Sequence, residues 1–106
     1  MIPIALASTT LPSAAAESLA RTILNLRLAA CVQISSPHQS LYFWEGKLET
    51  GSECTLLFKT RPSLLAKLEA TVRQHHPYEL PEWIVFSASA STDYSSWVEA
   101  STVAAE

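Results

Sequence analysis

The first third of the chain changes from a strand-like to a helix-like hydrophobic pattern and then back again. In residues 2–7 every second side chain is a large aliphatic one, which predicts a short first strand. Apolar residues then recur at helical spacing over residues 13–27, and this predicts the first helix. Residues 28–34 are apolar and do not extend the helical period, so they predict a second strand.

The middle of the chain predicts a long β-hairpin. The polar stretch 35–38 interrupts the second strand before pairing resumes. Residues 41–60 are rich in aromatic and β-branched side chains, and the triplet 50–52, Thr-Gly-Ser, is typical of a turn. We therefore place the tip of the hairpin near Gly51.

The last third predicts a helix, a strand and a helix. Leucines at helical spacing follow Pro62–Ser63, and this helix ends at His75–His76 because the residue before Pro77 avoids the helical region. Residues 83–88 predict a final buried strand. Asp93 is expected to cap a terminal helix.

The predicted order of elements is β-α-β-β-α-β followed by one helix, within a single domain that spans residues 1–106. Two right-handed crossovers in this order build an α+β ferredoxin-like sandwich, with helices on one face of a four-stranded antiparallel sheet. Strands as apolar as these do not leave the other face to water. We expect further copies of the chain to cover it.

Composition and charge exclude several classes of function. Charged residues make up 16 % of the chain and the formal net charge is −3, so the surface favours self-association and has no basic stripe for nucleic acid. No apolar window is long enough for a transmembrane helix. The apolar N-terminus lacks the basic region of a secretory signal, because the first positive side chain is Arg21. We therefore expect a cytoplasmic protein with no nucleic-acid or membrane partner.

Cysteines and glycines provide no catalytic motif. Cys31 and Cys54 lack CxxC spacing and are expected to be free buried thiols. With the predicted tip, Cys54 lies opposite a residue near Glu49 and far from Cys31, which disfavours a disulfide. The two glycines, at positions 46 and 51, cannot supply a phosphate-binding loop or a GxSxG elbow. We do not expect an enzyme.

The segment from His75 to Glu82 has the most chemically active side chains. His75 and His76 either cap the helix as partly protonated bases or each contribute one ligand to a transition-metal site, since sequence neighbours rarely chelate one ion together. Glu79 and Glu82 could act as general acid and base. Solvated or lysine-paired carboxylates are the commoner case.

Three successive aromatic residues, Tyr42, Phe43 and Trp44, lie in the predicted hairpin and must point to alternating faces. The three rings either pack in a core, or Tyr42 and Trp44 anchor a neighbouring subunit, as buried aromatics often do at interfaces. We favour the interface for at least one of the rings.

Four segments resemble the CutA divalent-cation tolerance family, in the family's order and spacing. They read RLAACV at 27–32, SLYFWEGKLE at 40–49, LFKT at 57–60 and HPYELPE at 76–82. The resemblance extends from about Ile2 to Ala100. It implies a ferredoxin-like subunit in a homotrimer, with long hairpins that reach across subunits and a plan similar to the PII proteins. It also implies binding of divalent metals, copper foremost, and no established catalytic activity.

The resemblance implies metal ligands as well. Some members are implicated in copper coordination through a cysteine at the end of the first strand and a His-His pair. His75 and His76 match that pair, whereas Ser8 stands where the cysteine would be. Serine is a poor metal ligand, so imidazoles with carboxylates or water would form a site of modest affinity.

By analogy with the family's plan, a cleft between subunits is expected to bring six side chains together: Trp44, Lys59, His76, Tyr78, Glu79 and Glu82. We therefore expect a homotrimer that binds copper(II) or other divalent metals weakly and serves ion tolerance. The alternative is a PII-like signalling trimer that binds a small anionic metabolite near Lys59. Lys59 beside these carboxylates could also be a simple interface ion pair.

Overall fold

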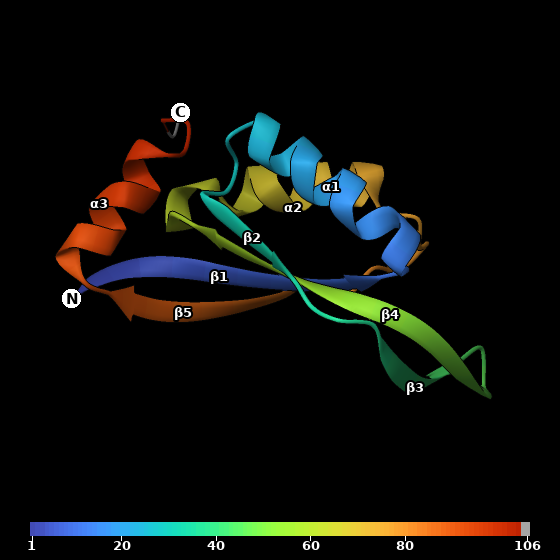
Figure 1. Cartoon of the computed structure of the whole chain (residues 1–106). Helices are drawn as coiled ribbons and strands as arrows, with labels where there is room; N and C mark the ends of the chain where they lie inside the picture. The colour runs from blue at the N-terminus through green and yellow to red at the C-terminus, as the bar shows by residue number, and fades with distance from the viewer. Residues whose placement is uncertain (105–106) are drawn as a thin grey trace.

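The computed structural model describes residues 1–104, which form five strands and three α-helices (Figure 1). The elements are β1 (Ile2–Leu11), α1 (Ser13–Asn25), β2 (Cys31–Ile34), β3 (His38–Trp44), β4 (Lys47–Thr60), α2 (Leu65–His75), β5 (Ile84–Ala90) and α3 (Thr92–Ala100). A 3-10 turn at Pro62–Leu64 precedes α2. No helix in this described part is long and apolar enough to cross a membrane.

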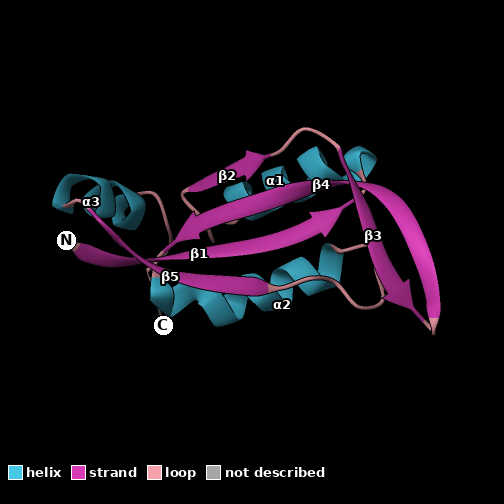
Figure 2. Cartoon of the chain, turned by 90° about the horizontal axis from the view of Figure 1, so that it is seen from below, coloured by secondary structure: helices cyan, strands magenta, loops and turns pink. Residues whose placement is uncertain are grey.

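The strands form an antiparallel sheet in the order β2-β4-β1-β5, and β3 pairs with the far half of β4. Helices α1 and α2 lie side by side on one face of the sheet, and the opposite face, seen in Figure 2, carries no helix over its centre. Helix α3 lies at the end of the sheet, beside the start of β1 (Figure 1). This is the predicted ferredoxin-like α+β fold.

The core lies between the helices and the sheet. Alternate residues of β1 and β4 face the helices, because successive side chains of a strand point to opposite faces. The largest buried contributors to this layer are Leu11, Leu19, Ile23, Leu28, Leu56, Phe58, Leu68 and Val72. The helices contribute the apolar faces that their spacing predicted, while β1 contributes Ala7 and Leu11 and not the larger residues at positions 2, 4 and 6.

Helix α1 ends two residues before its predicted end. Arg27 has a φ of 55°, the Leu28 amide donates to the Ile23 carbonyl at 3.2 Å, and the Arg27 amide donates to the Leu24 carbonyl at 3.0 Å. These are the two hydrogen bonds of a Schellman motif, which turns the chain out of the helix. The connection therefore consumes residues 26–30, and β2 begins at Cys31 and not at Leu28.

The predicted position of the hairpin tip is wrong. The turn is Glu45–Gly46, with φ values of 51° and 78°, and a two-residue hairpin loop of type I′ requires positive φ at both positions. Gly51 lies within β4 opposite Ser40. A Cβ at Gly51 would lie 3.6 Å from the Tyr42 hydroxyl oxygen, an ordinary van der Waals contact, so Gly51 packs against the Tyr42 ring.

The register also corrects the expected surroundings of the thiols. Cys54 is buried and lies opposite Leu11, not opposite a residue near Glu49. Cys31 lies opposite Lys59 and is partly exposed, contrary to the expectation that both thiols are buried. Both cysteines are free, as predicted.

The ends of the last elements differ slightly from the prediction. Strand β1 continues to Leu11, beyond the predicted end near residue 7, and β5 continues to Ala90. Ser91, and not Asp93, caps α3, since the Ser91 hydroxyl accepts a hydrogen bond from the Tyr94 amide at 3.3 Å. Asp93 lies in the first turn, where its charge still complements the helix dipole.

Candidate functional site

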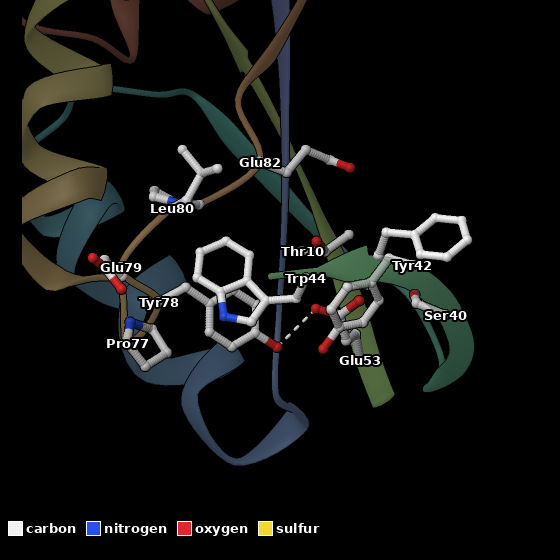
Figure 3. A pocket seen from close by; sticks show the side chains of 12 residues that line it. Thr10, Ser40, Tyr42, Trp44, Glu53, Pro77, Tyr78, Glu79, Leu80 and Glu82 are labelled. Carbon is white, nitrogen blue, oxygen red and sulfur yellow. Dashed lines mark hydrogen bonds between the residues drawn. The ribbon is translucent and has the colours of Figure 1, made fainter. Parts of the chain in front are cut away.

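A cleft of about 820 Å³ opens between the β3–β4 hairpin and the loop that joins α2 to β5 (Figure 3). The hairpin side is formed by aromatic rings and one carboxylate, and the loop side by one ring and two carboxylates. The rings and carboxylates of this lining are Tyr42, Phe43, Trp44, Glu53, Tyr78, Glu79 and Glu82.

The hairpin register gives its two faces different side chains. Tyr42 and Trp44 share one face with Glu53, because Tyr42 pairs with Glu49 and each strand alternates with a period of two. Phe43 and its cross-strand partner Leu48 lie on the other face. The inner face therefore lines the cleft, and Phe43 is the one outer-face residue that also contributes to the lining in the described part of the chain.

Glu53 and Tyr78 form the innermost polar contact of the cleft. The Tyr78 hydroxyl donates to Glu53 Oε2 at 2.7 Å, and Glu53 is only 7 % exposed (Figure 3). Burial raises the pKa of the Tyr78 phenol, and the hydrogen bond to Glu53 and its negative charge raise the pKa further. Tyr78 thus stays protonated and remains a donor to the Glu53 carboxylate.

His76 uses both of its ring nitrogens inside the protein. Nδ1 accepts the Tyr78 amide hydrogen at 3.1 Å, so the proton is on Nε2, which donates to the Thr10 carbonyl at 2.9 Å. Burial lowers the pKa of His76 below 6.5, against the opposing effects of the Thr10 carbonyl and the Glu53 charge. The ring also packs against the Tyr78 ring with centroids 4.9 Å apart. Metal ligation by His76 would require the loss of one of these hydrogen bonds.

His75 has a different environment although it is the next residue in the sequence. It is exposed at the end of α2, and its Nδ1 donates to the Thr71 carbonyl at 3.0 Å. The lone pair of Nε2 is then free to face solvent. The structure therefore does not bring the two imidazoles together on one ion. Within residues 1–104, no three His, Cys, Asp or Glu side chains cluster closely enough to hold a metal.

Ser8, which stands where the family resemblance places a cysteine, forms a hydrogen bond between β1 and the loop that joins α2 to β5. Its hydroxyl donates to Glu82 Oε2 at 2.9 Å, and Ser8 is nearly buried on β1. This contact joins residues 74 positions apart in the sequence, so no local pattern predicts it. It holds the loop against the face of the sheet that the helices leave uncovered.

The structure gathers most, but not all, of the expected cleft residues. Trp44, Tyr78, Glu79 and Glu82 line the cleft, and His76 lies behind Tyr78. Lys59 does not line it within one chain, because it lies on β4 opposite Leu6, with its Nζ 5.9 Å from the centroid of the Tyr94 ring. The expectation places Lys59 in a cleft between subunits, and it stays a prediction.

Sequence reasoning missed Glu53. The residue interrupts the strand between Ser52 and the apolar run that starts at Cys54. A glutamate directly before an apolar strand segment indicates a buried charge that needs a partner, since charged residues are almost never buried without one. Its contact with Tyr78 could not be derived without the correct hairpin register.

Comparisons with known proteins agree on one family. A family model described as CutA1 divalent ion tolerance protein matches residues 5–101. The divalent-cation tolerance protein CutA of Yersinia pestis is 44 % identical over 89 residues, which cover 83 % of this chain and 75 % of that protein. CutA1 from Oryza sativa superposes with a TM-score of 0.90 at 38 % identity, over 96 % of this chain and 95 % of that chain. The PII-like protein CutA from Nostoc sp. PCC 7120 superposes with a TM-score of 0.88 at 30 % identity, over 93 % and 97 % of the two chains. This chain belongs to the CutA1 divalent ion tolerance family.

Proposed function

We propose that the protein is a homotrimer that binds copper(II) or other divalent transition metals weakly and serves ion tolerance in the cytoplasm. Membership of a family named for divalent ion tolerance supports the physiological role. Two free cysteines favour a reducing compartment such as the cytoplasm.

Exposed apolar surface supports the assembly. Leu41 and Leu48 are each 62 % exposed and Phe43 is 78 % exposed, all on the outer face of a two-stranded hairpin that extends beyond the body of the sheet (Figure 1). A lone hairpin is marginally stable in water, so these side chains need cover. Ile84 and Phe86 of β5 are half-exposed on the sheet face without helices. The family resemblance supplies the expectation that further copies cover these surfaces and that there are three subunits.

The observation that carries the metal proposal is the free Nε2 of His75. A metal-binding imidazole commonly donates its other ring N–H to a carbonyl or carboxylate, which fixes the tautomer and the orientation of the ring. The His75–Thr71 hydrogen bond has that form. Imidazole suits copper(II), which heads the divalent affinity series. A single imidazole with water or a flexible carboxylate gives a weak site. The expectation that His76 is a second ligand stays a prediction.

Copper titration of two single variants tests the metal proposal. His75→Ala should remove the nitrogen hyperfine signal of bound copper(II) in electron paramagnetic resonance and lower the affinity measured by calorimetry. His76→Gln tests the second ligand: retention of both would show that His76, whose nitrogens face Thr10 and Tyr78, does not ligate copper. Unchanged stoichiometry and affinity in His75→Ala would remove the metal role from this residue. Sedimentation equilibrium of the wild type separately tests the trimer, and a stable folded monomer would refute it.

We propose binding and not catalysis as the activity. The hydroxyl of Ser40 lies 3.4 Å from His38 Nδ1, the arrangement of a nucleophile and its base. The other nitrogen of His38 contacts the Thr55 hydroxyl at 2.9 Å, so a carboxylate does not orient this imidazole. The pair therefore lacks the third member of a catalytic triad.

The cleft favours a second candidate function, a PII-like trimer that senses a small molecule. Its volume of about 820 Å³ is within the range of small-molecule sites. An anionic metabolite fits its lining poorly, since Glu53, Glu79 and Glu82 line the cleft and Lys59 lies elsewhere in the chain.

A further inference from the structure

Glu53 is a buried carboxylate that lacks a cationic partner within residues 1–104. The ion pairs in this part of the chain are Arg21–Glu17 and Arg73–Glu69, both within the surface of a helix. Tyr78 donates one hydrogen bond to Glu53 Oε2 but brings no positive charge. Burying a carboxylate without a counter-charge is costly, and the Glu53 side chain lines an open cleft. The cleft thus lacks the cation that would balance this charge.

The walls around Glu53 suit a cation with an apolar surface. Tyr42, Trp44 and Tyr78 approach the same space from the hairpin and from the loop (Figure 3). The face of an aromatic ring carries a negative quadrupole and attracts organic cations, above all quaternary ammonium groups held among several rings. A hydrated metal ion would instead need converging oxygen ligands, and no such cluster is present in the described residues.

We propose that this cleft binds a small organic cation with an alkylated ammonium group. Glu53 is its counter-ion, Tyr42, Trp44 and Tyr78 form its aromatic walls, and Glu79 and Glu82 add negative charge at the loop side. The inference goes beyond the proposed metal function and uses none of its ligands, since His75 does not line the cleft.

The cleft and the proposed trimer use opposite faces of the same hairpin. Tyr42 and Trp44 face the cleft, while Leu41 and Leu48 face outward and do not line it. Phe43 lies on the outer face but also reaches the edge of the cleft. Covering the outer face with a neighbouring subunit therefore leaves the inner rings available to a ligand. Ligand binding and assembly can be tested independently for this reason.

Calorimetry with choline and its uncharged carbon analogue 3,3-dimethyl-1-butanol tests the proposal on the wild type. The two molecules have nearly the same shape and differ in the charge, so choline should bind at least about tenfold more tightly. Glu53→Gln keeps a hydrogen-bond acceptor for Tyr78 and removes the negative charge. It should lower the affinity for choline by about tenfold. Glu99→Gln removes a charge from helix α3, outside the cleft lining, and it should leave the affinity within about twofold of the wild type.

A second pair of variants tests the aromatic walls and guards against a folding defect in Glu53→Gln. Trp44→Leu should lower the affinity for choline about tenfold. Trp97→Leu, on the distant helix α3, should leave this affinity unchanged. Equal binding of choline and the neutral analogue would overturn the proposal, as would absence of choline binding to the folded wild type. Choline binding that survives in His75→Ala, with copper binding lost, would separate this site from the metal site.

Discussion

The outer face of the hairpin gives the most direct test of how the protein assembles. Phe43 exposes 78 % of its surface in a single chain and pairs across the hairpin with Leu48, which is also exposed. We predict that Phe43→Ser dissociates the proposed trimer and leaves each chain folded. The substitution removes apolar surface from the proposed interface but no contact from the core between helices and sheet.

The magnitude follows from the exposed area. Full burial of a phenylalanine side chain contributes about 1.5–3 kcal/mol, so burying the exposed part of this ring contributes about 2 kcal/mol. A closed trimer buries three such rings, and their loss weakens assembly by about 6 kcal/mol. At about 1.4 kcal/mol per factor of ten, the dissociation constant of the trimer should rise about ten-thousandfold.

Sedimentation equilibrium at several chain concentrations measures this change, with circular dichroism as the check on folding. Leu26→Ser is the matched control, because Leu26 is half-exposed at the end of α1, on the helix side of the molecule. This control should sediment as the wild type does. Retention of the wild-type trimer by Phe43→Ser, or dissociation of Leu26→Ser alone, would show that the hairpin face does not hold the subunits together.

Three further substitutions test local features, each measured by urea unfolding at a fixed chain concentration. Thr9→Val should stabilise the protein by about 1 kcal/mol, because the buried Thr9 hydroxyl has no hydrogen-bond partner in the described residues; a loss of stability would refute this. Arg27→Gly should stabilise it by about 0.5–1 kcal/mol by relieving the positive φ of 55°, whereas Arg27→Ala should not. His76 has a lowered pKa in the folded state, so the unfolded chain binds more protons as pH falls below 6.5. The free energy of unfolding should reach its full value above pH 6.5. As the pH falls below 6.5, it should decrease by at most about 1.4 kcal/mol per pH unit, and less steeply in His76→Gln.

Periodicity predicted the fold because both layers of the core follow it. Alternation identified β1 as a strand and helical spacing identified α1 and α2, and the crossover rule then leaves a single topology. The β1 residues in the core are Ala7 and Leu11, so the large aliphatic residues at positions 2, 4 and 6 lie on the other face of the sheet. The position of the hairpin tip was predicted wrongly because of the local sequence at the turn. Glu45–Gly46 is not one of the Asn-Gly or Asp-Gly pairs typical of type I′ turns, and Gly51 looked like a turn residue although it lies beneath Tyr42.

The candidate site was predictable in its residue types but not in its contacts. The aromatic run and the loop carboxylates were evident from the sequence, whereas the Tyr78–Glu53 and Ser8–Glu82 hydrogen bonds join positions far apart in the chain. The two histidines show the same limit. Adjacent residues at a helix end have nearly opposite surroundings, one in solvent and one between Thr10 and Tyr78.

The Glu45–Gly46 turn determines which side of the hairpin serves assembly and which serves the cleft. Side chains alternate along each strand, so a shift of one residue would turn Trp44 outward and bring Phe43 inward. Such a shift would expose the aromatic walls and place Glu53 away from Tyr78. The positive φ angles that fix this two-residue turn therefore also fix the register on which both proposed surfaces depend. A variant that lengthens the turn should weaken trimer formation and ligand binding together, although it changes no residue of either surface.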